Sequence, residues 1–390
     1  MFPLILSIFL TCMASCLGHL KNVYNIDSSS NGVSDMTQTL LNAWSSACGN
    51  DSGGTVNVPS GTFKLNTVTF QGPCKGIVSF KVNGILQAPT DSKGGADWIK
   101  FSNVYGLQIS GSGTFDGQGS TAWKHTKCNK GSSQSAICTT SLKFNDVKNA
   151  TIQGITSLNS KFFHLAITRC ENFSINEITI TAPEDSPNTD GIHISNSNKV
   201  QVSNVKIGTG DDCISLGPGS TNINISSVKC GPGHGISIGS LGTSSDELPV
   251  QGVTVSDSSF TGTQNGARIK TFGSSVSNNV SDVIFQNIDV NDVKNPIIID
   301  QQYCPGSSCE EKGDSLVRIS NVKFINIKGT STSDVSVQLN CSASVPCQEI
   351  ELQDLKLTCK DGQATTKATC SNFKGTFEGD QDPPNCSNTA

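Results

Sequence analysis

The chain has 390 residues, of which 38 are glycine and only 15% are charged, and its net charge is −5. A negative net charge excludes a general polyanion-binding surface such as a nucleic-acid groove, although it leaves room for an anionic ligand at a local cationic spot. Beyond residue 18, no apolar stretch is long enough to span a membrane. We therefore expect neither a nucleic-acid partner nor a membrane partner, and the protein is expected to be a monomer.

The amino-terminal segment, MFPLILSIFLTCMASCLG, is an apolar run that ends in small residues. This pattern is typical of a secretory signal peptide, with cleavage after Cys16 or Gly18, and a buried strand is the alternative. After it, no Pro/Ser-rich linker, charge block or change in composition divides the chain. We expect residues 1–18 to be a signal peptide, residues 19–390 to form a single domain, and the mature protein to be secreted.

Sixteen cysteines are present, and two of them fall within the expected signal peptide, which leaves an even fourteen. In a secreted chain such cysteines indicate disulfides, and a zinc site is disfavoured because no CxxC pair occurs. Close spacing suggests the pairs Cys48–Cys74, Cys213–Cys230, Cys304–Cys309 and Cys341–Cys347. The tripeptides that would accept N-linked glycans begin at Asn50, Asn149, Asn172, Asn224, Asn279, Asn340 and Asn385.

Residues 34–48, SDMTQTLLNAWSSAC, predict the one convincing helix of the chain. Its apolar face comprises Met36, Leu40, Ala43, Trp44 and Ala47. Ser34 or Asp35 can cap its amino end. A stack of β-strands needs its first layer covered, because an open end exposes apolar core and unpaired backbone groups. We expect the helix to provide this cover.

From about Thr55 onward, short strands alternate with turns rich in Gly, Asn and Asp, as in GLQISGSGTF and NKVQVSNVKIGTG. Pairs of aliphatic residues at i and i+2 return about every 20 to 30 positions. This period favours a right-handed parallel β-helix, a solenoid in which each coil stacks on the one before. An antiparallel sandwich is the alternative, but it does not predict equivalent residues at a fixed spacing.

Three β-type segments begin at Gly191, Cys213 and Gly235, so the same interval separates each segment from the next. If each interval is one coil, residues at this spacing form columns across neighbouring strands about 4.8 Å apart. One predicted column contains Asp190, Asp212, His234 and Asn265. A second, three residues further on, contains His193, Ser215, Ser237 and Arg268.

The columns would bring three carboxylates, a histidine and two cations into one patch, since Asp211 and Lys270 are close neighbours of the column residues. Each residue alone has a structural explanation: an aspartate in a turn is usually a turn former, and the cations could be solvated. Clustered carboxylates raise each other's proton affinity, so the complete group is better explained by catalysis. Paired carboxylates serve glycoside hydrolysis, in which one protonates the leaving oxygen and another handles water.

The motifs NTD at 188–190, GDD at 210–212, GHG at 233–235 and RIK at 268–270 resemble, in order and spacing, the four signature segments of the polygalacturonases of glycoside hydrolase family 28. The resemblance covers essentially the whole mature chain. The strings GTGDDCISLGPGS and CGPGHGISIGSLG are most similar to plant pollen-type exopolygalacturonases. The family implies hydrolysis of α-1,4-galacturonosyl linkages in de-esterified pectin of the plant cell wall. It also implies inversion at the anomeric carbon and neither a metal nor another cofactor.

The resemblance also implies a role for each matching residue. Asp211 matches the general acid, Asp190 and Asp212 match the pair that positions and deprotonates water, and His234 matches the residue that supports protonation of the acid. The residues implied to bind substrate are Arg268 and Lys270, which would hold its carboxylate, with Tyr303 and Asn188 lining the sugar site. A guanidinium can grip a carboxylate with two hydrogen bonds, and a lysine adds a point charge beside it.

Three other functions remain open from the sequence. Endo-acting cleavage is the first alternative to exo-acting cleavage, because loops that close one end of a cleft decide between them. A pectate lyase shares the β-helix, but it would need a calcium-binding carboxylate cluster and an arginine base in place of GDD and GHG. A non-catalytic cell-wall carbohydrate-binding protein is the last, and the complete set of motif residues argues against it.

Overall fold

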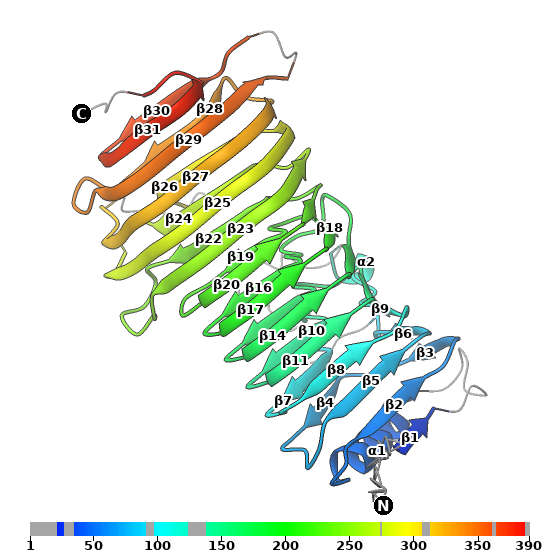
Figure 1. Ribbon diagram of the computed structural model, residues 1–390. Coiled ribbons are helices and arrows are strands. Elements are labelled where there is room, and N and C mark those ends of the chain that lie inside the picture. Colours follow the sequence, from blue (N-terminus) through cyan, green and yellow to red (C-terminus); the bar gives the residue numbers. More distant parts are fainter. Residues whose placement is uncertain are drawn as a thin grey trace, which may run out of the picture.

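Strands in this chain are short and alternate buried with partly exposed side chains, as in β2 (Gly54–Val58). The computed structural model describes residues 22–26, 35–90, 97–123, 138–273, 275–305, 313–360 and 364–386. Within them the chain winds as a right-handed parallel β-helix, and every strand-to-strand ladder is parallel (Figure 1). The inward side chains form one continuous apolar core. The predicted fold class is therefore confirmed, and the antiparallel sandwich is wrong.

The sheet that carries the motif segments has 11 strands. In order along the helix they are β4 (Val68–Gln71), β7 (Ile99–Ser102), β10 (Leu142–Asn145), β13 (Leu165–Thr168), β16 (Ile192–Ser195), β19 (Ile214–Leu216), β22 (Ile236–Leu241), β24 (Asn265–Phe272), β26 (Asn295–Tyr303), β28 (Val335–Asn340) and β30 (Lys367–Ser371).

The second sheet has 20 strands and begins as two rows. The first row is β1 (Asn22–Asn25), β2, β5 (Val78–Val82), β8 (Leu107–Ser110), β11 (Lys148–Gln153), β14 (Glu171–Asn176), β17 (Asn198–Ser203) and β20 (Thr221–Ser226). The second row is β3 (Thr62–Lys64), β6 (Ile85–Gln87), β9 (Thr114–Asp116), β12 (Thr156–Leu158), β15 (Thr179–Thr181), β18 (Lys206–Gly208) and β21 (Lys229–Cys230). Both rows then pair with one long strand and continue as β23 (Val250–Thr261), β25 (Asn278–Val293), β27 (Val317–Ser331), β29 (Cys347–Cys359) and β31 (Phe373–Asp382).

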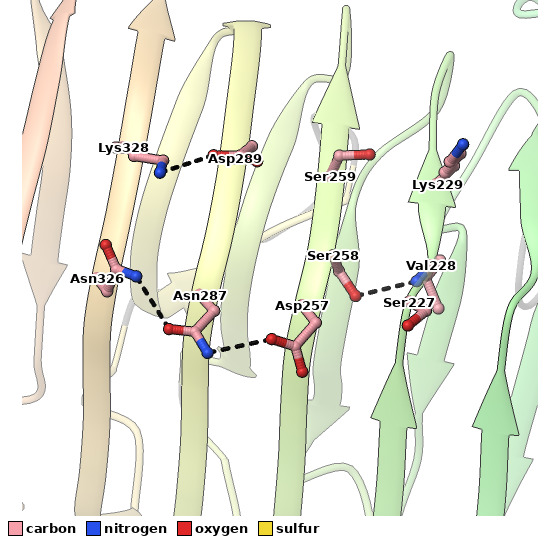
Figure 2. Close-up of a pocket in the computed structure, with 10 residues that line it drawn as sticks. All are labelled: Ser227, Val228, Lys229, Asp257, Ser258, Ser259, Asn287, Asp289, Asn326 and Lys328. Carbon is pink, nitrogen blue, oxygen red and sulfur yellow. Dashed lines mark hydrogen bonds and ion pairs between the residues drawn. The ribbon is translucent and has the colours of Figure 1, made fainter.

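A stacked row of left-handed residues makes the corner between these two rows. Ser227, Asp257, Asn287 and Asn326 have φ values of 55°, 51°, 54° and 50°. Asn and Asp tolerate this conformation better than other non-glycine residues. Asn326 Nδ2 donates to Asn287 Oδ1 at 2.9 Å, and Asn287 Nδ2 donates to Asp257 Oδ1 at 3.1 Å (Figure 2). A groove of about 400 Å³ follows this corner, and none of the predicted site residues lines it.

The core repeats along the helix axis in the same register as the strands. Phe70, Phe101 and Phe144 are paired across β4, β7 and β10. Their ring centroids lie 5.1 and 5.5 Å apart, close to the spacing between strands. Aromatic residues at one position of successive coils therefore pack ring against ring along the helix axis.

Helix α1 (Thr37–Cys48) covers the first coil, as the sequence predicts (Figure 1). The indole Nε1 of Trp44, in this helix, donates to the backbone oxygen of Gln71 at 3.1 Å. The ring centroids of Trp44 and Phe70 lie 5.1 Å apart. The helix begins at Thr37, later than the predicted residue 34. Asp35 precedes it and accepts from the backbone N–H of Thr37 at 3.0 Å. A second helix in the described part of the chain, α2 (Ser120–Trp123), is a single turn.

Three of the suggested disulfides are confirmed, namely Cys48–Cys74, Cys213–Cys230 and Cys341–Cys347, and Cys370–Cys386 is a fourth pair that spacing did not suggest. Cys304 is disulfide-bonded, but Cys309 lies outside the described residues. The expectation that all fourteen cysteines pair is wrong, because Cys170 and Cys359 are free. Cys170 lies in the core as a small apolar side chain, and burial raises the pKa of its thiol to about 11.

The expected signal peptide, residues 1–18, lies outside the described residues. Among the described residues, no helix has the length and apolar character needed to cross a bilayer.

Candidate active site

The three evenly spaced segments do stack as consecutive coils. Ile192, Ile214 and Ile236 are paired across β16, β19 and β22. Two residues before each of them stand Asp190, Asp212 and His234, which therefore occupy equivalent positions on neighbouring strands. The second predicted column is paired in the same way, from His193 through Ser215 and Ser237 to Arg268. Both columns are confirmed.

Asp212 is the buried centre of the site. Its side chain is fully buried, and Oδ1 accepts from Ser237 Oγ at 2.7 Å and from an Arg268 Nη at 2.5 Å. Oδ2 accepts from Lys270 Nζ at 2.9 Å. Burial alone would raise the pKa of Asp212, but the charges of Arg268 and Lys270 hold it well below its ordinary value. The two cations therefore favour the ionised form of the Asp212 carboxylate.

The two cations reach Asp212 from one strand, β24. Arg268 and Lys270 alternate along this strand, so their side chains leave it on the same side. Both are nearly buried, with side-chain exposures of 9% and 3%. Arg268 Nε also donates to Ser237 Oγ at 2.8 Å, and Lys270 Nζ lies 5.0 Å from the ring centroid of Tyr303. The strand thus delivers a fixed pair of positive charges to one edge of the site.

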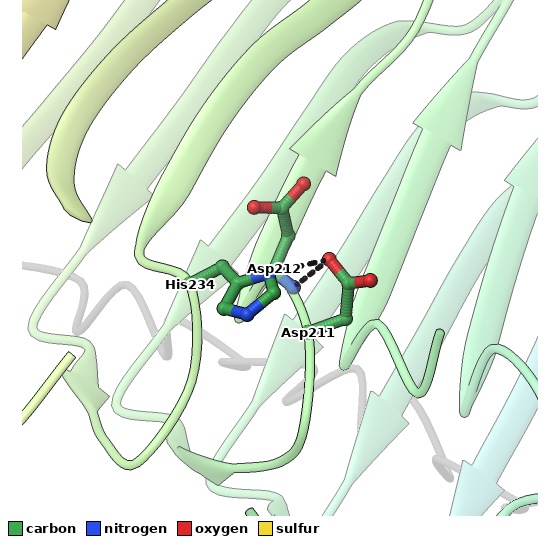
Figure 3. A group of neighbouring side chains, drawn as sticks. All are labelled: Asp211, Asp212 and His234. Atoms are coloured by element: carbon green, nitrogen blue, oxygen red, sulfur yellow. Dashed lines mark hydrogen bonds and ion pairs between the residues drawn. The ribbon is translucent and has the colours of Figure 1, made fainter. Parts of the chain in front are cut away.

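Asp211 and His234 form a second, more exposed pair. His234 Nδ1 lies 3.1 Å from Asp211 Oδ1, and the two side chains are 35% and 21% exposed (Figure 3). The backbone N–H of His234 also donates to the Asp211 carbonyl at 2.8 Å. Gly233 before it has a φ of 149°, and a Cβ there would lie 2.8 Å from that same carbonyl. Glycine is therefore needed to bring the histidine loop this close to the aspartate loop.

Asp190 is buried on the coil before Asp212, and its Oδ2 accepts from Ser215 Oγ at 2.7 Å. The loop that carries it is tied to the next coil, because Thr189 Oγ1 accepts from the backbone N–H of Gly210 at 3.0 Å. Asn188 lies half-buried in this loop with a φ of 50°. The loop is therefore held in place by the coil that supplies Asp211 and Asp212.

Comparison with known proteins identifies the family. Residues 48–381 match the glycosyl hydrolases family 28. The chain is 43% identical to an exopolygalacturonase from Platanus acerifolia, over 93% of this chain and 97% of that protein. The chain belongs to glycosyl hydrolase family 28. It is also 43% identical to a polygalacturonase from Prunus persica, over 94% of this chain and 93% of that protein. The fold is similar to that of an endo-xylogalacturonan hydrolase from Aspergillus tubingensis, with a TM-score of 0.78, 24% identity and coverage of 92% and 99%.

The structure brings together the family 28 motif residues that the sequence singled out. Tyr303 ends β26, half-buried beside Lys270, with its ring 5.7 Å from that of Phe272. Asn265, predicted as a column member, donates its side-chain amide to the backbone oxygen of His234 at 3.2 Å. It therefore supports the histidine loop.

The spacing placed Ser215 and Ser237 in the second column but did not predict their carboxylate partners. Ser215 bonds to Asp190 and Ser237 bonds to Asp212, and both pairs are 25 residues apart in the sequence. This separation is the sum of two intervals. One is the length of a coil, which is the interval from Asp190 to Asp212, and the other is the offset between the two columns. The spacing therefore contained the signal for these two hydrogen bonds, although the sequence prediction assigned the serines only to a column and gave them no partner.

A metal ion is a poor fit to this family 28 site. Among the described residues, Asp211, Asp212 and His234 offer ligand atoms that lie within 4.8 Å of one another. Both oxygens of Asp212, however, already accept from Arg268 and Lys270. A metal cation here would lie beside two protein cations and compete with them for the same carboxylate.

The Asp211–His234 pair predicts how stability depends on pH. Burial would lower the pKa of His234, but the hydrogen bond and charge of Asp211 raise it above 6.5. A raised folded-state pKa stabilises the fold fully below the unfolded-state pKa, and this contribution is lost as pH rises through the raised value. The melting temperature of wild type should therefore exceed that of His234→Gln most at about pH 5, and the difference should shrink by about pH 9.

Thermal denaturation of both proteins across this range measures the effect. Lys75→Gln is the control, because it removes an exposed ion pair, between Lys75 and Asp51, that involves no histidine. A difference between wild type and His234→Gln that widens with pH would contradict the raised pKa.

Proposed function

We propose that the protein is a polygalacturonase that hydrolyses α-1,4-galacturonosyl linkages of de-esterified pectin with inversion and acts from the chain end. One observation carries the proposal: an accessible Asp211–His234 pair lies beside a buried Asp212 whose charge is fixed by Arg268 and Lys270. Such a site separates a group that can transfer a proton from a carboxylate that stays ionised, as glycoside hydrolysis by two carboxylates requires.

Asp211 is the proposed general acid. Its Oδ1 accepts from the backbone N–H of Asp212 at 2.7 Å and lies 3.1 Å from His234 Nδ1. Both contacts use Oδ1, which leaves Oδ2 to carry the proton given to the leaving glycosidic oxygen. Once its proton has left, Asp211 is ionised, and its hydrogen bond and charge raise the pKa of His234. His234 then donates a proton to Asp211 through the Nδ1–Oδ1 contact and regains one from solvent.

Asp190 and Asp212 divide the work on water. Because two cations hold the pKa of Asp212 low, Asp212 is a poor proton acceptor and serves to position the water. The proton of the attacking water therefore goes to Asp190. The water oxygen bonds to the anomeric carbon while the glycosidic C–O bond breaks, and the leaving oxygen takes the proton of Asp211. Attack from the side opposite the leaving group inverts the configuration.

The cations suit an anionic substrate. Arg268 uses Nε and one Nη on Ser237 and Asp212, so its other Nη can donate to a galacturonate carboxylate. Lys270 retains two further N–H donors, and the Tyr303 ring beside it offers a surface for the sugar. Asn188 is proposed to contact the sugar from the loop that carries Asp190. A local cationic spot is needed because the net charge of the chain is −5 and repels the polymer.

Exo action and location are further parts of the proposal. The Platanus relative is named an exopolygalacturonase, which supports cleavage from the chain end, whereas the Prunus relative is named a polygalacturonase. The disulfides support an oxidising compartment. We propose that residues 1–18 direct secretion and that residues 19–390 act as one monomeric catalytic domain in the plant cell wall.

Incubation with polygalacturonate, followed by a reducing-sugar assay and product sizing, tests the function. We expect reducing ends to appear, with galacturonate monomer as the early product. Methyl-esterified polymer should be cleaved much more slowly, because it presents no carboxylate to Arg268 and Lys270.

The other outcomes identify the alternatives. Early mixed oligomers would indicate endo action, and an ultraviolet-absorbing unsaturated product would indicate a lyase. Equal rates on free and esterified polymer would refute the carboxylate-binding role of the cations. Binding without any cleavage would refute the enzymatic proposal in favour of a carbohydrate-binding protein.

A further inference from the structure

Asp190 and Asp212 are each held by a serine from the next coil. Each of these serines has a second hydrogen-bond partner, which is a nitrogen atom. Ser237 bonds to Asp212 and accepts from Arg268 Nε at 2.8 Å. Ser215 bonds to Asp190 at 2.7 Å, and its Oγ lies 2.8 Å from His193 Nδ1. The two serines therefore receive their nitrogen partners from opposite directions along the helix axis. Arg268 lies on the coil after Ser237, whereas His193 lies on the coil before Ser215, in β16.

The hydrogen bonds determine the form of His193. A serine hydroxyl has one hydrogen, and Ser215 gives it to Oδ2 of Asp190. Ser215 must then accept from its other neighbour. Nδ1 of His193 therefore carries a hydrogen, and the direction of the chain is His193 to Ser215 to Asp190.

Packing holds the His193 ring so that this donor stays aimed at Ser215. The ring of Phe163 stacks on His193 with centroids 4.8 Å apart and an interplanar angle of 23°. Phe162 stacks on Phe163 in turn, with centroids 4.0 Å apart. At Gly217, a Cβ would lie 3.3 Å from Cε1 of His193, so only glycine leaves the ring its full space. A ring packed in this way loses little further freedom when it donates.

We propose that His193 is a positioning residue that orients Ser215 and, through it, the carboxylate of Asp190. The inference rests on the proposed function, in which Asp190 accepts the proton of the attacking water. A hydroxyl with one partner can rotate, whereas a hydroxyl that both donates and accepts has one orientation. Small displacements of a reacting group reduce rates strongly, so this orientation is expected to affect turnover more than substrate binding.

Two substitutions separate the donor of His193 from its ring. His193→Phe keeps a ring on Phe163 but removes the Nδ1 hydrogen. His193→Asn removes the ring but places an amide N–H close to the position of Nδ1. On polygalacturonate we expect His193→Phe to lower kcat by about 10- to 100-fold with little change in KM. This is the size of effect expected when a hydrogen bond is lost from a series that ends at a charged carboxylate. His193→Asn should retain most of the wild-type kcat.

The opposite result would be an active His193→Phe and a raised KM in His193→Asn. It would overturn the inference, because it would mean that the ring acts by stacking on the sugar. Equal kcat in both variants and wild type, with only the melting temperature lowered, would also overturn it. Should His193→Phe fail to fold, His193→Gln replaces it, since the longer amide reaches the position of Nε2 instead of Nδ1. His193→Asn should then have a higher kcat than His193→Gln. Equal kcat values in these two variants would refute the positioning role of His193.

A double-mutant cycle with Ser215→Ala tests the route. If His193 acts through Ser215, the double variant His193→Phe/Ser215→Ala should be no slower than Ser215→Ala alone. Losses that multiply would show that His193 acts on its own and would overturn the inference. A wild type that releases no reducing ends would overturn the proposed function, whereas an active wild type with an equally active His193→Phe overturns only the inference.

Discussion

Asp211→Asn is expected to lower kcat on polygalacturonate by about 10²- to 10⁴-fold, the usual contribution of a positioned general acid or base. An amide cannot give a proton to the leaving glycosidic oxygen. The substitution keeps the size of the side chain and an oxygen that can accept from the backbone N–H of Asp212. Folding should therefore be intact, and the loss should appear in initial rates. The melting temperature should stay close to that of wild type at about pH 9, where the Asp211–His234 pair contributes least to stability.

Asp257→Asn is the matched control. Asp257 lies at the corner of the other sheet, in a left-handed backbone conformation, and asparagine occupies the equivalent positions on the next coils (Figure 2). Its rate should equal that of wild type. Near-normal turnover of Asp211→Asn would mean that the general acid is another residue.

The second large effect concerns stability. Asp212→Asn should lower the free energy of unfolding by about 3–5 kcal/mol, the usual cost of breaking a buried ion pair from one side. Both oxygens of Asp212 accept from cations, Oδ1 from Arg268 and Oδ2 from Lys270. Whichever way the new amide turns, its NH₂ group faces one of these donors. Two buried positive charges then lack their counter-charge. Denaturant-induced unfolding measures the loss.

Asp289→Asn provides the comparison for this experiment. Asp289 pairs with Lys328 at 3.7 Å on the 20-stranded sheet, and the two side chains are 70% and 58% exposed. Such a pair contributes about 0–1 kcal/mol, so the unfolding midpoint should hardly move. A similarly small change in Asp212→Asn would mean that the buried cluster contributes no more than a surface pair.

The repeat made much of this site predictable from sequence. The constant interval from Asp190 to Asp212 to His234 places them on successive coils, because parallel strands in register align equivalent residues. The same reasoning puts Ser215 and Ser237 in line with Arg268 from the sequence alone. Spacing succeeds here because coil length is constant through this part of the chain.

The contacts of Arg268 and Lys270 were less accessible to sequence reasoning. They lie 56 and 58 residues from Asp212, beyond a longer coil, and motif resemblance assigned them to the substrate alone. Which donor reaches which oxygen depends on side-chain rotamers, and spacing contains no information about these. The free thiol of Cys170 is similar, since an even cysteine count does not indicate which sulfur atoms meet.

The corner of left-handed residues between the two rows has a consequence for how the molecule can vary. Because the coils that carry Ser227, Asp257, Asn287 and Asn326 turn at equivalent corners, and each coil contacts only its neighbours, a coil behaves as an interchangeable module. Adding or removing one coil on the amino-terminal side of β13 would lengthen or shorten the active-site face by about 4.8 Å. The residues from Asp190 to Tyr303 would keep their mutual positions. Reach along the polymer can therefore change without altering the chemistry at the site.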